Sequence, residues 1–309
     1  MPLLRQKSVF AFKTEATAGT QESLSGTDGA FNVWDAKIEP EISMAERDAQ
    51  GSFSNLVQVP EQRKAKATFR TEIHGDGAAG VPGWASTLFP ACGLVNSAGV
   101  FSLKAEAPGS NVKTLTMAHY QDGRRSIMYG AVGSAKFVLE AGKIAYIDWT
   151  FQGLWGGVSD VSILTPTYPT VKPFRVASLP AFNIGSWAPC FSKFELDLGN
   201  IIADRPCAGG ATGFTHPIIT GRKIRGSIDP EAALVASADP YGDWLAMTES
   251  DFDLDLASST DKFQFDAPKF QVIGISGGER SGILVDTIQF ALNRSSANND
   301  ELTITFTSP

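Results

Sequence analysis

The chain has 309 residues, of which 43% are hydrophobic, and its 26 basic and 33 acidic residues leave a net charge of −7. This length suits two domains of about 150 residues, each large enough to bury its own core, and the acidic balance argues against tight nucleic-acid binding. The three cysteines, Cys92, Cys190 and Cys207, lack CxxC spacing, which argues against a disulfide framework or a zinc site and favours a reducing compartment.

The chain begins MPLLR, without an apolar signal segment, and no run approaches the roughly 20 apolar residues of a membrane span. We therefore expect synthesis and folding in the cytoplasm. Thirty glycines, 20 phenylalanines and short alternating apolar runs indicate a mainly β protein.

The first clear strand, residues 37–42 (KIEPEI), recurs as residues 193–198 (KFELDL). Further blocks match in the same order: 63–66 with 222–225, Trp84 with Trp244, and 150–151 with 305–306, each separated by about 155 to 160 residues. We interpret this as a tandem duplication. Pro40 cannot donate to a β-ladder, so the first strand is expected at an edge or at a bulge.

Long connections follow this strand in both copies, at residues 43–61 and 199–220, and both carry apolar residues. Exposed apolar loops are costly for a soluble monomer and usually mark a contact surface. The alternative is that each loop folds back on its own domain as a hairpin. The predicted contact residues are Phe53, Leu56, Val57 and Val59 in the first loop and Phe214, Ile218 and Ile219 in the second.

One short helix is expected in each copy. The first follows Pro82-Gly83 and places Trp84, Leu88 and Cys92 on one face, and the second begins at Asp239-Pro240 and carries Trp244 and Leu245. The fold class is therefore mainly β, with two tandem copies of a β-barrel or sandwich domain, each with one short flanking α-helix.

The sequence between the copies, TPTYPTVKP, is rich in proline and favours an extended, semi-rigid connector at about 165–180. The predicted domains are residues 1–165 and 166–309.

Catalytic and ion-binding signatures are weak. His74, His119 and His216 have no partner at ligand spacing. Residues 251–255 (DFDLD) imitate the start of a calcium loop, but Leu256 and Lys262 stand where glycine and glutamate are needed, so we expect a strand with an acidic wet face.

Two glycine motifs are also better explained by structure than by chemistry. Residues 51–54 (GSFS) lack the spacing of a nucleophile elbow. Gly277-Gly278 is interpreted as a hairpin turn. No catalytic, metal or cofactor site is predicted, and the chain is not expected to be an enzyme.

Three regions together resemble the tail tube proteins of long, non-contractile-tailed bacteriophages (siphovirus major tail proteins). They are residues 12–20 (FKTEATAGT), the strand at 37–42 with its long loop, and PGW at 82–84 running to ACG at 91–93. Glycine-rich strand pairs such as residues 139–153 add to the likeness, which covers most of the first copy and is fainter in the second.

The resemblance implies a virion protein that stacks in rings to form the tail tube, whose lumen conducts the genome to the host without binding it specifically. Most such proteins have one domain and six subunits per ring, so a duplicated chain implies homotrimeric, pseudo-hexameric rings. It also implies assembly in the host cytoplasm and contacts with terminator, tape-measure and distal tail or baseplate proteins. The alternatives are another ring component of the tail, such as a terminator or baseplate protein, and a carbohydrate-binding or hydrolytic β-sandwich.

Overall fold

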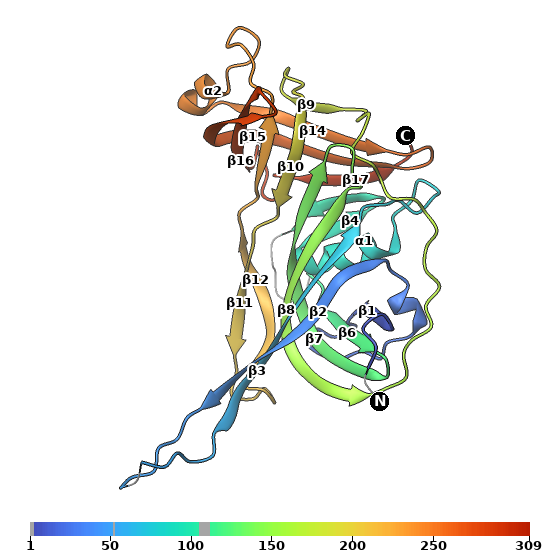
Figure 1. Ribbon diagram of the computed structural model, residues 1–309, viewed down its shortest axis with the longest axis vertical. Helices are drawn as coiled ribbons and strands as arrows, with labels where there is room; N and C mark the ends of the chain where they lie inside the picture. The colour runs from blue at the N-terminus through green and yellow to red at the C-terminus, as the bar shows by residue number, and fades with distance from the viewer. Residues whose placement is uncertain (1–2, 52, 105–111) are drawn as a thin grey trace.

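Antiparallel strands make up most of the computed structural model, which describes residues 3–51, 53–104 and 112–309 (Figure 1). The mainly β character predicted from the alternating apolar runs is confirmed. In residues 1–165 the elements are β1 (Ser8–Thr14), β2 (Val33–Ala45), β3 (Val59–Glu72), α1 (Gly83–Leu88), β4 (Leu94–Ser97), β5 (Val100–Leu103), β6 (Leu115–Gln121), β7 (Arg124–Glu140) and β8 (Tyr146–Asp160), with 3₁₀ turns at Gly26–Gly29 and Phe89–Cys92.

The second half has the same kind of composition. Its elements are β9 (Phe182–Ile184), β10 (Phe191–Asp197), β11 (Asn200–Pro206), β12 (Phe214–Arg222), β13 (Arg225–Pro230), α2 (Pro240–Ala246), β14 (Glu249–Ala257), β15 (Lys262–Arg280), β16 (Ile283–Leu292) and β17 (Thr303–Thr307).

One large sheet runs through both halves. Its strands follow the order β2-β3-β8-β7-β10-β13-β16-β15-β17-β5-β4, and β11 pairs with β12 in a separate two-stranded ribbon. Among the described residues these pairings form an open path, not a closed barrel. β3 is the one partner of β2 among the described strands, so β2 lies at an edge, which is one of the two positions that Pro40 predicted.

The two halves pair their strands in the same order. The first half reads β1-β6-β7-β8-β3-β2, and the second reads β9-β14-β15-β16-β13-β10. Within this order, Ile38, Ala67 and Phe151 lie side by side across β2, β3 and β8. The corresponding row across β10, β13 and β16 is Phe194, Ile228 and Ile288.

This comparison corrects one detail of the sequence alignment. Residues 305–306, which the sequence matched to 150–151, lie on β17, where Phe306 pairs with Phe263 of β15. The strand beside β13 is β16, so Ile288 holds the place that Phe151 holds beside β3. Both β16 and β17 alternate apolar and polar residues, and alternation alone does not specify a strand's partner.

The hydrophobic core is continuous across the predicted domain boundary, so the expectation of independent cores is wrong. Phe137 of β7 contacts the ring of Phe265 at a centroid distance of 4.9 Å, and Trp84 of α1 contacts Phe306 at 5.8 Å. These four side chains belong to one buried cluster. The cores merge because β10 pairs with β7 and β17 pairs with β5, which places strands of both halves over the same apolar space.

Both predicted helices are present near Trp84 and Trp244, but they differ in burial. Trp84, Leu88 and Cys92 are buried, as their shared face predicted. The second helix begins with Pro240 after Asp239, whose carboxylate accepts a hydrogen bond from the Gly242 N–H at 2.8 Å. None of its residues is buried.

The connector between the halves runs as an extended chain along one side of the molecule (Figure 1). Val161 and Leu164 pack against the small apolar cluster of β1 and β6. Further on, the N–H of Phe174 donates to the carbonyl oxygen of Ile73 at 2.8 Å. The connector is therefore held to the first half at both ends.

Gly277-Gly278 is not the hairpin turn that the sequence suggested. Both glycines lie within β15, paired with Asp286 and Val285. The turn is at Ser281-Gly282, where both residues have positive φ values (52° and 85°), the conformation of a two-residue type I′ hairpin turn.

A buried carboxylate fixes the segment after β1. The side chain of Glu15 is almost inaccessible to solvent and accepts four hydrogen bonds. Its donors are Thr114 Oγ1 (2.6 Å), Thr116 Oγ1 (2.9 Å), Gly130 N (2.7 Å) and Gly19 N (2.7 Å). The carboxylate thus joins this segment to β6 and β7 by hydrogen bonds that replace its hydration.

Candidate assembly surfaces

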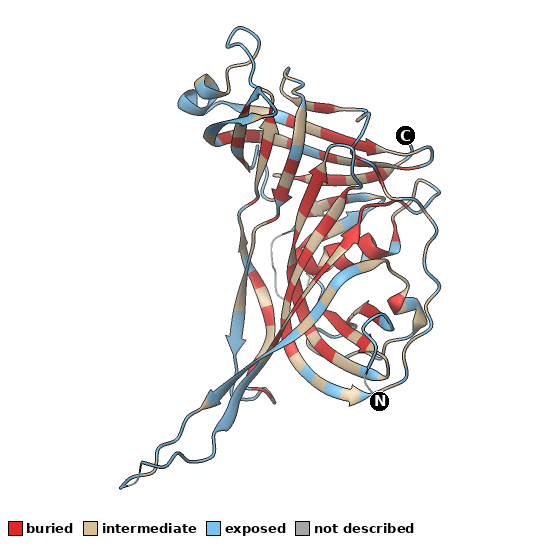
Figure 2. Cartoon of the chain, viewed as in Figure 1, coloured by how far each residue is buried: buried red, intermediate tan, exposed pale blue. Residues whose placement is uncertain are grey.

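The distal part of the β2–β3 hairpin, residues 43–61, extends away from the body of the molecule (Figure 1); we call it the arm. Pairing of β2 with β3 continues to Ala45 and Val59, so the base of the arm continues the sheet, and an isolated bridge joins Asp48 to Asn55 farther out. Figure 2 shows it as exposed along its length. The four predicted contact residues of this loop lie on it, with exposed fractions of 110% for Phe53, 43% for Leu56, 82% for Val57 and 45% for Val59.

The loop at 199–220 has a different environment, and its predicted role as a contact surface needs correction. It forms the β11–β12 hairpin, in which Phe214 and Ile219 are buried and Ile218 is half-buried. The Nζ atom of Lys64, on β3, lies 5.5 Å from the Phe214 ring centroid and 2.7 Å from Asp204 Oδ2. The hairpin therefore packs on its own chain, as the alternative interpretation of these loops proposed, although it covers strands of the first half.

A second exposed apolar surface lies at the opposite end of the molecule from the arm, around α2 (Figures 1 and 2). We call it the α2 end. Leu234, Val235, Leu245 and Met247 have exposed fractions of 79%, 71%, 83% and 71%. The sequence predicted this helix at its observed position, but as a helix flanking its β domain and not as an exposed apolar surface. In the sequence, the N-cap Asp239 and the first-turn Asp243 mark the start of this helix, Leu245 lies in its last turn and Met247 follows it directly.

Two strand edges are unpaired at the ends of the row β2-β3-β8-β7-β10-β13-β16-β15. The outer edge of β2 has no partner among the described strands. Of the strands that the structure describes, only β16 pairs with the second half of β15, residues 272–280, because β14 pairs no further than Gln271. Unpaired edges present free N–H and C=O groups that can pair with another chain.

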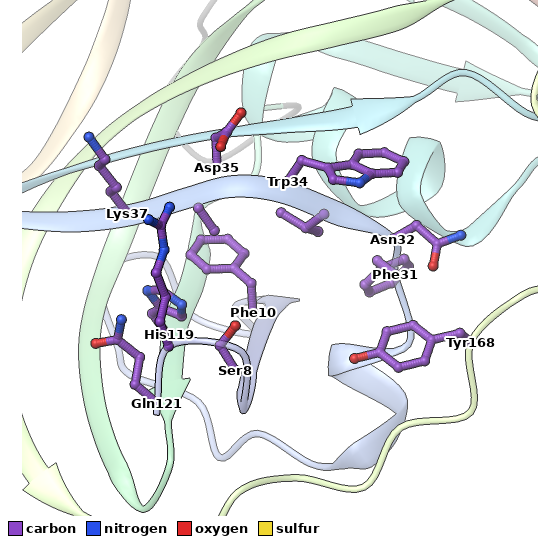
Figure 3. A pocket seen from close by; sticks show the side chains of 13 residues that line it. Ser8, Phe10, Phe31, Asn32, Trp34, Asp35, Lys37, His119, Gln121 and Tyr168 are labelled. Atoms are coloured by element: carbon purple, nitrogen blue, oxygen red, sulfur yellow. The ribbon is translucent and has the colours of Figure 1, made fainter. Parts of the chain in front are cut away.

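A cavity of about 610 Å³ lies between β1 and β2 (Figure 3). Phe10 of β1, Trp34 of β2, Phe31 just before β2 and Tyr168 of the connector contribute aromatic rings to its lining. Arg5, Lys37 and His119 also line it. Burial lowers the pKa of His119, and the charge of Arg124 lowers it further.

The face of the sheet opposite the core carries charges of both signs in pairs. Arg70 of β3 donates to Asp148 of β8 at 2.7 Å, and this bond raises the pKa of the guanidinium. Glu195 of β10 lies 2.9 Å from Lys136 of β7 and 2.6 Å from Lys193. These carboxylates and cations therefore largely neutralise one another.

The remaining candidate residues of the sequence do not come together. His74 is buried against Trp84, His119 lies beside the cavity and His216 is on β12. Within residues 3–51, 53–104 and 112–309, no cluster of three or more His, Cys, Asp or Glu side chains could hold a metal ion. Of the GSFS stretch, Ser52 lies outside the described residues. Cys92 is buried, and Cys190 and Cys207 are exposed.

The acidic run at 251–255 lies on β14, as predicted, with Phe252 and Leu254 buried. On its polar face Asp253 lies directly opposite Asp266 of β15. Burial raises the pKa of both carboxyls, and the neighbouring carboxylates raise it further.

A raised folded-state pKa means that the charged pair costs stability at neutral pH, and that this cost disappears as the pH falls through the folded pKa values. We therefore expect Asp266→Asn to raise the free energy of unfolding at pH 7 by about 0.5 kcal/mol, the scale of one repulsive cross-strand pair. At about pH 4 and below, where both carboxyls take up protons, the difference should vanish. Urea unfolding at the two pH values measures it, and an equal gain at both would refute the electrostatic cause.

No protein-family model matches the chain, and a search of curated proteins gave no significant match. In the part of the chain that the structure describes, no helix has the length and apolar character needed to span a membrane.

Proposed function

We propose that this chain is the tail tube subunit of a long, non-contractile bacteriophage tail, and that three copies close into a ring whose stacking builds the tube. The observation that carries the proposal is the junction of β7 with β10. This junction joins the two halves of one chain. The strands that correspond to β7 and β10 are β15 and β2, and each has an unpaired edge at one end of the row.

The shared pairing order supports a tandem duplication, and it defines which edges correspond. β2 occupies the place of β10 and β15 the place of β7. Within the chain, residues 136–140 of β7 pair antiparallel with 193–197 of β10. The unpaired residues 272–280 of β15 and the outer edge of β2 could repeat this contact between two chains, except that Pro40 removes one backbone donor.

A contact that joins unlike surfaces generates a ring when its rotation closes, and otherwise an open filament. If the angle between the halves of one chain is repeated between chains, three chains give six equivalent junctions and leave no edge of the row exposed. The ring wall would then be one continuous sheet.

Stacking requires surfaces at the two ends of the ring. The arm and the α2 end lie at opposite ends of the molecule and carry most of its strongly exposed apolar side chains (Figure 2). Several strongly exposed apolar side chains gathered in one place on a monomer are typical of an interaction site. We propose that the arm of one ring contacts the α2 end of the next.

The paired charges on the sheet face support a passage for DNA. If this face lines the lumen, Arg70, Lys136 and Lys193 are already paired with carboxylates, which weakens their attraction for phosphate. Pairing of charges would thus limit the binding of DNA to the wall.

Electron microscopy and native mass spectrometry of the purified chain test this function. We expect rings of three chains with pseudo-sixfold symmetry, and tubes at higher protein concentration. Six full-length chains per ring would contradict the duplication argument. Rings that never stack would favour a terminator or baseplate component, and a strictly monomeric chain at all concentrations would refute the proposal.

A further inference from the structure

The tip of the β15–β16 hairpin exposes two aliphatic side chains without an evident role in this chain. Ile283 and Leu284 follow the tight Ser281-Gly282 turn, with exposed fractions of 47% and 71%. A turn of two residues needs no large apolar side chain beside it for its conformation. Both lie on β16, opposite Arg280 and Glu279 of β15, and the carbonyl oxygen of Leu284 accepts a hydrogen bond from the Ala232 N–H at 2.9 Å. The hairpin tip that carries them stands at the end of the unpaired edge of β15, where a neighbouring chain would begin.

The corresponding turn of the first half, between β7 and β8, is in contact with the second half. The N–H of Ala141 donates to the carbonyl oxygen of Ser192, and the N–H of Gly142 to that of Val176, both at 2.8 Å. Ala141 also borders a cavity of about 460 Å³ that Phe182 of β9 and Phe191 of β10 line. Within one chain, then, this turn lies against the space between β9 and β10.

The larger cavity of Figure 3 occupies the equivalent position in the first half, between β1 and β2. β1 pairs with β6 as β9 pairs with β14, and β2 corresponds to β10. Ala36, which lines this cavity, stands as far before Ile38 as Ser192 stands before Phe194. The lining comes from the segment before β1, from β1, β2 and β6, from the residues just before β2 and from the connector, and its walls include Phe10, Phe31 and Trp34.

We propose that the β15–β16 hairpin tip of one copy inserts Ile283 and Leu284 into the β1–β2 cavity of the adjacent copy in the ring. The partner is a second copy of this chain, because the chain already makes the same contact once internally. The apolar tip would pack against the aromatic walls of the cavity. The carbonyl oxygen of Ala36 would accept a hydrogen bond from the hairpin tip, as the carbonyl oxygen of Ser192 accepts one from the Ala141 N–H within the chain. This inference rests on the proposed ring.

Two experiments test the contact, with ring formation by the unmodified chain as the reference. Leu284→Asp places a charge on an exposed position, so the single chain should fold normally. The fraction of the chain found in rings should fall about tenfold or more, because the contact would have to bury a charge in place of a leucine. Leu245→Asp, on α2, is the matched control and should leave rings intact, because that residue belongs to the stacking surface.

Cross-linking gives an independent measurement. In a Cys190→Ser, Cys207→Ser background, the double variant Ala36→Cys, Leu284→Cys is treated with a short bis-maleimide. Covalent dimers and trimers are expected on a denaturing gel, and the pair Ala36→Cys, Leu245→Cys should give none.

The outcomes separate the two proposals. Normal rings from Leu284→Asp together with no cross-linked species would overturn the hairpin contact and leave the proposed function standing. An unmodified chain that forms no rings would overturn the proposed function, and the hairpin contact with it.

Discussion

The Glu15→Gln variant is expected to unfold with a Tm about 5 °C below that of the unmodified chain. The Glu15 carboxylate accepts two backbone N–H groups, from Gly19 and Gly130, and two threonine hydroxyls. A glutamine NH₂ group cannot accept either N–H, so at least one buried donor loses its partner. Hydrogen bonds to charged groups and the desolvation of an orphaned donor give a cost of about 3 kcal/mol, which corresponds to this shift in Tm for a chain of this size.

Glu22→Gln is the matched control. Glu22 also belongs to the segment after β1, but its carboxylate accepts one backbone N–H, from Ala16 at 3.1 Å, and its side chain is 24% exposed beside Lys13. Its replacement should change the Tm little. Thermal unfolding of both variants by circular dichroism measures the difference, and equal Tm values for the two would show that the four bonds of Glu15 do not hold the fold.

The strands and helices were predictable because their signals are local. Alternating apolar residues indicated strands wherever one face is buried, as in β3 and β17. The pair Asp239-Pro240 predicted the start of α2 because its capping bond is made within one turn. Pro40 likewise predicted an edge strand from its missing donor.

The way the halves join was not predictable. Pairing of β7 with β10 and of β17 with β5 links residues far apart in sequence, and the apolar face of each strand would look the same against any partner. The turn at Ser281-Gly282 was missed for a related reason. A Gly-Gly pair is a strong turn signal, but here its glycines lie within a strand and Ser281 adopts the positive φ.

The two apolar loops likewise have local signals in the sequence, but their partners do not. Apolar residues in a loop indicate that the loop is buried against a partner. The sequence does not show whether that partner is the same chain or another chain. For Phe53 and Val57 the structure leaves the side chains exposed, and for Phe214 and Ile219 the body of the same chain covers them. The α2 end was missed because a helix with Trp244 and Leu245 has the pattern of a core-facing helix.

The arm carries the largest expected effect on assembly. In the Phe53→Ser, Leu56→Ser, Val57→Ser variant we expect rings but no tubes. All three side chains are exposed in the single chain, so their loss should change its Tm by about 1 °C at most. Between rings, each large side chain that becomes buried contributes about 1.5–3 kcal/mol, and every chain of a ring supplies one arm, so the losses add up around the ring.

Negative-stain microscopy shows whether tubes form, and native mass spectrometry shows whether rings form. The control variant Ile144→Ser, Val158→Ser removes exposed apolar residues outside the arm, with exposed fractions of 42% and 55%, and should form tubes normally. A serine-substituted arm that still gave long tubes would assign stacking to another surface. Loss of rings as well as tubes would instead place the arm in the contact that closes the ring, since only that contact is needed before stacking begins.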